Sequence, residues 1–475
     1  MTSPTVALED DRSRTRAKPD AVLLIVPGAF AALLVIVLLL VFDVVLGLAA
    51  LAALVIFALV VDSPGRAGVA FLLLTPLLAG FERGAMIPVM RPSEALLGLL
   101  LAAILARALA DGLDGRLPAY RVTGIDRAIL GLAVLSSGVP LLWRYGRGFA
   151  LTVDDVLFAA TLWKYFLVFA LFRLVVQTEE QVKHCLQAML GVGVIVALVA
   201  LVQALSIGSA PQLISDIYGL PLDTIDNNRG SSTLGTSHGV ADIMAFDLGI
   251  CAAFLMKGLG DRRVLGAAAV LFGLATLASG QFSALFAIVV AVVIIGGFRG
   301  QMLRTVGVAV PAMAGSLVLL RPVIDARLAS TNESGVPSSW DARRFNLENY
   351  FWPELFDGTN WLLGVRPAGR LPSFEPWREW VYIESGHTWL LWTGGVPFLL
   401  AFLWFSWLVG RRAHSLASAP GVTGALGVSL VVAFWVVFIL MAFDVHLTMR
   451  GPADAFFPLV ALSTVPALKT ARSPS

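Results

Sequence analysis

The chain has 475 residues, of which 58% are hydrophobic and 14% are charged, and its formal net charge is +2. Soluble domains usually carry about 25% charged residues, so this chain holds more apolar surface than a soluble core can bury and is predicted to be a polytopic membrane protein. The absence of a dense basic face excludes a nucleic-acid-binding role, and Cys185 and Cys251 belong to no CxxC or His/Cys cluster that would indicate a zinc site or a disulfide framework.

Apolar runs long enough to cross a membrane recur along the whole chain. A spanning helix needs about 20 apolar residues, and about fourteen runs approach that length. In chain order they are 22–42, 44–61, 67–80, 93–109, 125–142, 155–176, 186–206, 240–257, 263–278, 281–298, 303–320, 388–409, 423–443 and 453–468. The first run is too long for the core of a signal peptide and is expected to be an uncleaved span. Three of the runs are short and are expected to be tilted spans or half-spans.

Lysine and arginine are concentrated in alternate loops, which the positive-inside rule assigns to the cytoplasm. This register makes 1–21 a cytoplasmic tail, and it gives spans 1 to 11 within 22–320, with an external loop at 207–239. Spans 12 to 14 and a cytoplasmic C-terminal tail then occupy 388–475. The segment 321–387 becomes the one large external loop, and its content of Trp, Pro, Arg and Glu predicts short folded helices rather than a linker.

Two polar stretches open predicted spans. The stretch 227–242, NNRGSSTLGTSHGVAD, places Arg229 before small and hydroxyl residues and His238 near the membrane surface. It can bind a ligand, or it can be an interfacial loop with a snorkelling arginine. In the tight turn 279–283, SGQFS, Gln281 can donate a hydrogen bond to a ligand, although serine and glycine are also ordinary turn residues.

The large loop contains an adjacent arginine pair, Arg343 and Arg344, followed by Tyr350 and Trp352 at helical spacing. Guanidinium groups bind phosphate oxygens in a forked geometry and aromatic faces can stack on sugar rings, so this pattern suits an anionic ligand that carries sugars. The arginines can instead bridge nearby carboxylates. Those carboxylates are Asp341, Glu348 and Glu354.

His387 heads the predicted span at 388–409, and Glu384 lies one helical turn earlier. Imidazole changes its protonation near neutral pH and also donates hydrogen bonds to phosphate. A histidine at the start of a helix is, however, often a cap or a packed polar residue.

Taken together and in their order along the chain, the polar stretches described above resemble motifs of the O-antigen ligase/polymerase family of bacterial envelope glycan enzymes. The run 229–241 is similar to the family's arginine, small-residue and glycine run that opens a span, with His238 where asparagine is usual. The turn 279–283 is similar to a Ser-Arg-rich turn, with Gln281 near the usual arginine position.

The resemblance continues in the second half of the chain. The arginine pair, Tyr350 and the Leu-Gly-Val turn at 363–365 resemble the family's large-loop signature, with Arg366 replacing a glycine. The run 387–396, HTWLLWTGGV, resembles a His-Asn-x-x-Leu…Gly-x-x-Gly stretch in which Thr388 replaces the asparagine and the glycines are shifted. Each motif is degenerate, and their order and common external placement give the combination its specificity.

The resemblance implies an all-α fold like that of the type C glycosyltransferases in the bacterial cytoplasmic (inner) membrane. The donor would be an oligosaccharide on a polyprenyl (undecaprenyl) pyrophosphate, and the acceptor a glycan or lipid at the external face, as for a polysaccharide polymerase or an O-antigen-type ligase. Direct displacement at the sugar carbon predicts inversion. No metal or other cofactor is expected, because no acidic pair lies in a convincing external position.

Pyrophosphate is a good leaving group, so the enzyme mainly needs cations that stabilise the departing charge. The candidates are Arg229 and either Arg343 or Arg344, while His387 would contact the pyrophosphate or deprotonate the acceptor hydroxyl. Glu384 is a reserve base. The expected substrate-binding residues are Gln281, His238, Tyr350, Glu384 and Trp352.

Charges inside the predicted spans keep a different class of protein open. Lys164, Asp242 and Asp247 lie within spans, where a charge usually marks an ion pair or a transport path, and Lys164 is a candidate partner of Asp247. The alternative function is a secondary transporter or a lipid-linked oligosaccharide flippase, which would have a central cavity and repeat symmetry. A structural partner in an envelope complex is a third option. The sequence shows no strong internal repeat and its polar candidates gather at one face, which favours the enzyme.

Overall fold

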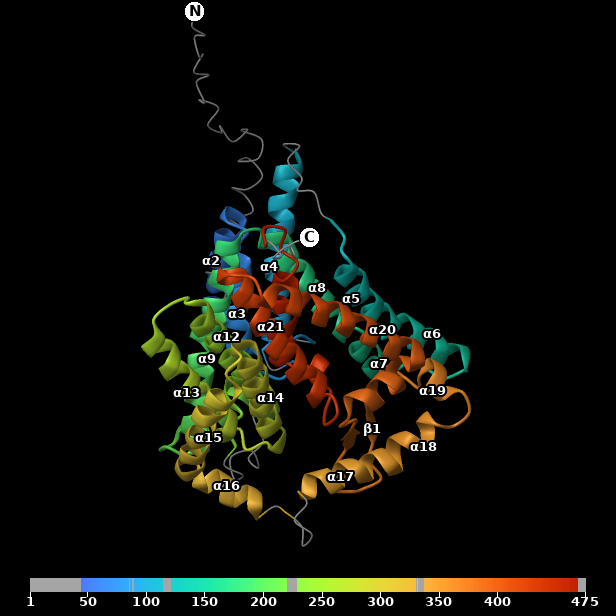
Figure 1. Ribbon diagram of the computed structural model, residues 1–475. Coiled ribbons are helices and arrows are strands. Elements are labelled where there is room, and N and C mark those ends of the chain that lie inside the picture. The colour runs from blue at the N-terminus through green and yellow to red at the C-terminus, as the bar shows by residue number, and fades with distance from the viewer. Residues whose placement is uncertain are drawn as a thin grey trace, which may run out of the picture.

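The computed structural model describes residues 44–84, 86–87, 89–113, 121–219, 229–329, 331 and 337–468 (Figure 1). In this part of the chain the protein is mostly helical and has one two-stranded antiparallel sheet, in agreement with the predicted all-α class. The predicted span at 22–42 lies outside the described residues.

The helices α2 to α9 in the first half of the chain overlap predicted apolar runs, while α10 and η1 lie in the predicted external loop 207–239. Their bounds are α2 (Val44–Asp62), α3 (Arg66–Leu78), α4 (Pro92–Leu113), α5 (Gly124–Leu135), α6 (Gly138–Gly146), α7 (Val153–Ala159), α8 (Thr161–Val175), α9 (Glu179–Ala204), α10 (Ala210–Tyr218) and the 3-10 turn η1 (Ser232–Leu234). Two predicted runs each form two consecutive helices. Between α5 and α6, the Ser137 hydroxyl donates to the Ala133 carbonyl (2.6 Å), a local bond that competes with the regular helical pattern.

The second half of the chain alternates long helices with shorter elements. Their bounds are α12 (Ser237–Lys257), α13 (Arg262–Ala278), α14 (Phe282–Arg299), α15 (Met302–Leu319), α16 (Arg321–Leu328), α17 (Ser338–Asn346), the π-helical turn η2 (Leu347–Phe351), α18 (Trp352–Leu355), α19 (Asn360–Leu363), β1 (Arg370–Pro372), β2 (Trp380–Tyr382), α20 (Gly386–Ala417), α21 (Gly421–Leu440), the 3-10 turn η3 (His446–Thr448) and α22 (Pro452–Leu462).

Seven helices in the described residues are long and apolar enough to cross a membrane, so the protein is a multi-pass membrane protein. They are Pro92–Gly112, Gly124–Gly146, Val153–Val175, Glu179–Ala204, Ser237–Lys257, Gly386–Ala417 and Gly421–Leu440. An eighth would be α15 with α16, which are bent by 81°. Four more apolar helices have 10–17 residues, which is short for a full crossing. The count of about fourteen spans therefore stays a prediction.

The centre of the bundle is formed by α12 and α21, which pack against each other and against α9 and α14. Most residues of these two helices are buried, as expected for helices that are apolar on all sides. Gly249 permits the close approach, since a Cβ atom there would lie 2.9 Å from the Val432 side chain. Polar residues of α12 consequently lie in the interior of the protein.

The suggested pairing of Lys164 with Asp247 is wrong. Lys164 Nζ on α8 lies 2.7 Å from Asp454 Oδ1 in the first turn of α22. The Asp454 side chain is 2% exposed, and its other oxygen accepts a hydrogen bond from the Gly451 amide. The packing of α22 against α8 brings this closer carboxylate to the lysine.

Loss of this ion pair is expected to destabilise the protein. Lys164→Met leaves Asp454 buried without its counter-charge, which costs about 3–5 kcal/mol when one partner of a buried pair is removed. Thermal unfolding of the purified protein measures the effect. The double variant Lys164→Met/Asp454→Asn should recover most of the loss, and single variants that unfold like the wild type would contradict the role of the pair.

We call residues 321–387 the cover, because their described parts lie along one end of the bundle (Figure 1). The cover consists of short helices, as expected, and of a β1–β2 hairpin that was not predicted. Arginines attach it to the α6–α7 region: Arg366 Nε lies 2.8 Å from Asp155 Oδ1, and Arg370 contacts both oxygens of Asp154. Arg147 Nη2 donates to the Val365 carbonyl (2.7 Å). These contacts fix the cover against the bundle.

Two glycines let the cover reach α20. Gly364 has φ +88°, and a Cβ atom there would lie 2.7 Å from the Thr393 carbonyl oxygen. Gly395 has φ +64° at a kink in α20, and a Cβ atom there would lie 2.2 Å from the Leu362 carbonyl oxygen. Any other residue at either position would be strained and would clash with backbone. The glycine turns in the sequence thus mark a close contact between α19 and α20.

Candidate functional site

Three arginines and a histidine gather where the cover meets the bundle, and we call Arg229, Arg327, Arg343 and His238 the arginine cluster. Arg343 Nη2 on α17 lies 3.2 Å from His238 Nε2 in the first turn of α12. A guanidinium only donates hydrogen bonds, so His238 Nε2 accepts in this contact. A Cβ atom at Gly280 would lie 3.5 Å from Arg229 Cγ and 3.7 Å from Arg327 Cδ, so these two side chains flank the same turn. The charges of Arg229 and Arg343 both act on Arg327.

Gln281 joins the edge of this cluster. Its Nε2 atom donates to the hydroxyl of Ser237 (2.5 Å), the residue before His238, and its side chain is buried. The structure therefore brings together Arg229, His238, Gln281 and Arg343, which come from three separate polar stretches of the sequence. Arg327 was not singled out from the sequence, because nothing around it at the end of an amphipathic helix distinguishes it.

Glu384 borders the arginine cluster from the other side. Its Oε1 atom lies 3.8 Å from Arg343 Nε, and its Oε2 atom accepts a hydrogen bond from Asn346 (3.2 Å). The side chain of Arg343 is 14% exposed and that of Glu384 is 33% exposed. Burial raises the pKa of Glu384, and the charge of Asp444 raises it further against the opposing charge of Arg343. Glu384 is thus a carboxylate with enhanced basicity beside a guanidinium.

Of the two adjacent arginines, only Arg343 faces the bundle. Arg344 is 76% exposed and its Nε atom bonds to Glu348 one turn later (2.7 Å), which is one of the bridging partners considered from the sequence. The neighbouring position on the helix points away from the cluster, because successive residues are rotated by about 100° around a helix.

The two predicted aromatic residues of the cover have structural contacts. Tyr350 is buried, stacks on Phe374 with ring centroids 5.0 Å apart, and accepts a hydrogen bond from the Phe374 amide. Trp352 Nε1 donates to the Thr388 hydroxyl (3.4 Å). The π-helical turn Leu347–Phe351 changes the helical phase between the arginines and these rings. Neither ring is placed in the arginine cluster.

His387 is also separate from the cluster. Ser385 caps α20 by accepting a hydrogen bond from the Thr388 amide (3.3 Å), so Glu384 precedes the helix and faces α17. His387 lies in the first turn on an exposed face, and among the described residues no hydrogen bond or ion pair joins it to the arginine cluster.

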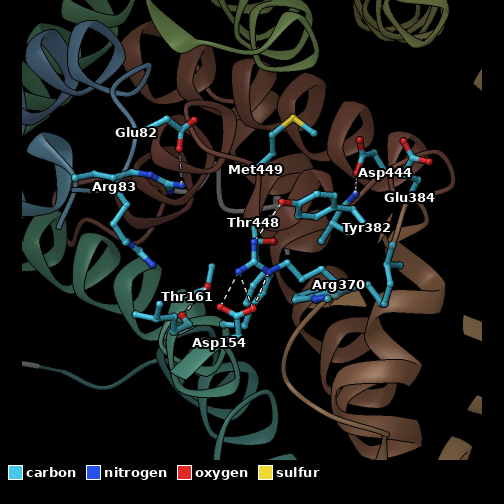
Figure 2. Close-up of a pocket in the computed structure, with 17 residues that line it drawn as sticks. Glu82, Arg83, Asp154, Thr161, Arg370, Tyr382, Glu384, Asp444, Thr448 and Met449 are labelled. Carbon is cyan, nitrogen blue, oxygen red and sulfur yellow. Dashed lines mark hydrogen bonds and ion pairs between the residues drawn. The ribbon is translucent and has the colours of Figure 1, made fainter. Parts of the chain in front are cut away.

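A polar cavity of about 680 Å³ lies next to the arginine cluster, since Glu384 lines the cavity and lies close to Arg343. Figure 2 shows Glu82 and Arg83 on one side, Tyr382, Glu384 and Asp444 on the opposite side, and the Arg370 guanidinium in contact with Asp154. Its lining is Glu82, Arg83, Arg91, Asp154, Leu157, Phe158, Thr161, Gly369, Arg370, Tyr382, Ile383, Glu384, Trp389, Asp444, Val445, Thr448 and Met449. Glu384 therefore belongs to both features, since it lines the polar cavity and contacts Arg343.

An apolar groove of about 640 Å³ lies on the side of the bundle and has one end near the arginine cluster in the chain. It is lined mainly by α13, α14 and α15, with residues such as Ala269, Ile288 and Val308. Leu277 and Leu319 also line it, and they are followed in the chain by the Gly280 turn and by the helix that carries Arg327. The opposite end of the groove is lined by Arg304 and Thr305 at the start of α15.

A buried acid–histidine pair lies beneath these features and was missed by sequence reasoning. His446 Nδ1 lies 2.5 Å from Asp242 Oδ2, and the side chains are 1% and 0% exposed. Asp242 was noted as an intramembrane charge, but its partner was not identified. The segment FDVH, 443–446, which follows an apolar run with an acid and a histidine, is the signal that could have drawn attention to Asp444 and His446.

Among the residues that the structure describes, no group of three or more His, Cys, Asp or Glu side chains is arranged to hold a metal ion. The site consists of guanidinium groups, carboxylates and an adjoining apolar groove. Comparisons with family models, with curated proteins and with solved structures gave no match to this chain, so the chemistry of these residues carries the functional interpretation.

Proposed function

We propose that the protein is a membrane glycosyltransferase that moves an oligosaccharide from a polyprenyl pyrophosphate to a hydroxyl group of a glycan or lipid acceptor. The observation that carries the proposal is the position of Glu384, which lines the polar cavity and also lies 3.8 Å from Arg343 in the arginine cluster. A base that touches both an acceptor cavity and a phosphate-binding cluster is what such a transfer requires.

The donor fits the arginine cluster and the apolar groove. The pyrophosphate oxygens would contact Arg343, Arg229 and Arg327, and the polyprenyl chain would occupy the groove along α13 and α15. Cations that already point at the phosphates stabilise the negative charge that grows on the leaving group. This arrangement gives Arg343, rather than Arg344, the catalytic role.

The acceptor fits the polar cavity. Its hydroxyl oxygen attacks the anomeric carbon of the donor, the bond from that carbon to the phosphate oxygen breaks, and the hydroxyl proton moves to the Glu384 carboxylate. Attack opposite to the leaving group inverts the anomeric centre. The placement of Glu384 favours it as the base over His387, which lies on an exposed face.

Topology and location are part of the proposal. The arginine cluster, the polar cavity and the cover lie at one end of the bundle, and the distribution of Lys and Arg assigns this end to the external face of a bacterial cytoplasmic membrane. The termini would then be cytoplasmic. Donor and acceptor would meet after the lipid-linked oligosaccharide has crossed the membrane.

The test is a transfer reaction with the purified protein in lipid nanodiscs. A lipid-linked oligosaccharide is supplied alone or with a second, labelled glycan acceptor, and the products are separated by size. A ladder of lengths indicates a polymerase, and a single addition to the second acceptor indicates a ligase. Formation of no glycosidic bond with any donor–acceptor pair would defeat the proposal.

The second candidate is a transporter or flippase, which one observation favours. Asp247 in the middle of α12 is 1% exposed, and in the described part of the chain neither of its oxygens has a hydrogen-bond partner. Such intramembrane carboxylates can mark a transport path. This function predicts movement of a lipid-linked oligosaccharide across a vesicle membrane without bond formation, and loss of that movement in Asp247→Asn.

A further inference from the structure

We propose that the polar cavity is a binding site for an uncharged saccharide and that it rejects saccharides with carboxylate or phosphate groups. The volume of about 680 Å³ lies within the range of about 300–1,000 Å³ that small-molecule sites occupy. The identification of this saccharide as the acceptor rests on the proposed function, but its binding does not.

The charges of the lining argue against an anionic ligand. Every guanidinium group that lines the polar cavity already faces a carboxylate: Arg83 bonds to Glu94 (2.7 Å), and Arg91 lies 4.0 Å from Glu82. Arg370 holds both oxygens of its partner at 2.7 and 2.8 Å. An anion would have to compete with these carboxylates for the donors of Arg83 and Arg370.

The remaining carboxylates face the cavity as hydrogen-bond acceptors. Asp444 accepts the Val445 amide through one oxygen (2.7 Å), and Glu384 lies opposite the Arg83 side of the cavity (Figure 2). Carboxylates accept hydrogen bonds from hydroxyl groups strongly, because the acceptor carries a full charge. The same groups repel a second carboxylate or a phosphate. Closely spaced donors and acceptors therefore suit a ligand rich in neutral hydroxyl groups.

An aromatic wall completes the site. Trp389 and Phe158 meet at Gly369, where a Cβ atom would lie 3.4 Å from Trp389 Cδ1 and 3.7 Å from Phe158 Cε1. All three residues line the cavity, where Phe158 is half-buried and Trp389 is 6% exposed. Tyr382 adds a phenol that is 51% exposed. Aromatic surfaces beside hydrogen-bonding groups match the apolar faces and polar rims of a sugar ring.

Binding is tested with the full-length protein in nanodiscs and without any lipid-linked donor. The probes are a neutral trisaccharide and the same trisaccharide with one uronic acid, and saturation-transfer NMR with titration gives their affinities. The neutral probe is expected to bind at least about tenfold more tightly. Equal binding of both probes, or no saturable binding of the neutral probe, would overturn the inference.

Matched variants locate the bound sugar. Tyr382→Ala is expected to weaken binding of the neutral probe by about fivefold or more. Tyr145→Ala is the control, because Tyr145 is 72% exposed and does not line the cavity. Asp154→Asn frees the Arg370 guanidinium and should improve binding of the acidic probe relative to the neutral one. Wild-type affinity in Tyr382→Ala and unchanged selectivity in Asp154→Asn would place the sugar elsewhere, and melting temperatures verify that each variant is folded.

Two outcomes separate this inference from the proposed function. If the neutral probe binds in the cavity but no transfer reaction occurs, the saccharide site stands and the glycosyltransferase proposal fails. If transfer proceeds with the same KM for the acceptor in Tyr382→Ala and in the wild type, the glycosyltransferase proposal stands and the saccharide site fails.

Discussion

Replacing Arg343 by alanine is expected to lower the rate of oligosaccharide transfer by about 10²–10³-fold, the usual effect of removing one preorganised group that stabilises transition-state charge. The Arg343 side chain is 14% exposed and lies between His238 and Glu384. Because this guanidinium is partly desolvated and already held in place, its surroundings need little reorganisation when the pyrophosphate departs. The measurement is kcat at saturating donor and acceptor.

The neighbouring residue provides the control. Arg344→Ala removes the same charge from the same helix, but Arg344 is 76% exposed and bonds to Glu348. Its rate should stay close to that of the wild type. Equal losses in the two variants would mean that net charge or folding, rather than contact with the pyrophosphate, explains the effect. A fully active Arg343→Ala variant would remove the arginine cluster from the mechanism.

The second large effect is expected for Glu384→Gln, which should lower kcat by about 10²–10⁴-fold because a general base is lost. The base acts when it is ionised, so the wild-type rate should rise with increasing pH through the pKa of Glu384. Burial raises this pKa above the ordinary carboxyl range, and the rising limb should therefore lie at a higher pH than for an exposed glutamate. The variant should lose this limb.

Two comparisons make the pH experiment specific. Glu348→Gln changes a carboxylate of the same segment that pairs with Arg344, and its pH profile should match the wild type. Arg343→Ala removes a positive charge that opposes the rise in the pKa of Glu384, so its residual activity should rise at a higher pH than in the wild type. A limb that persists in Glu384→Gln and disappears in His387→Gln would assign the base to His387.

The helices were largely predictable because their apolar runs are long and continuous. The run 44–61 corresponds to Val44–Asp62, and 263–278 corresponds to Arg262–Ala278. Hydropathy could not show the break between α5 and α6, because it arises from a local hydrogen bond of Ser137 within an apolar stretch. The β1–β2 hairpin was also missed, since each of its strands has only three residues.

The candidate site was predictable only where the sequence carried a compact polar stretch. Arg229, His238, Gln281 and Arg343 were found in this way, and the fold brings them together. The direction of each side chain was not predictable. A π-helical turn redirects the two aromatic residues, and the cap of α20 turns Glu384 and His387 to different sides.

The pairings that were missed depend on tertiary contacts between residues far apart in the sequence. Asp154 and Arg370 are separated by 216 residues, and their contact exists only because the hairpin folds over the start of α7. Asp242 and His446 are 204 residues apart and meet through the packing of α12 in the centre of the bundle. One sequence without an observed fold cannot indicate such pairs.

The arginine contacts of the cover have a consequence for access to the site. Arg147, Arg366 and Arg370 tie the 364–370 stretch to the α6–α7 region, while α16 and α17 carry Arg327 and Arg343 on the far side. An opening of the cover would pivot about the tied stretch and swing the α17 side, because α16 is packed on the bundle through Val323, which is 1% exposed. Such a hinge would withdraw the Arg343 guanidinium from His238 as the entrance widens, so that in the proposed reaction the spent carrier lipid would leave by the same movement that dismantles its binding site.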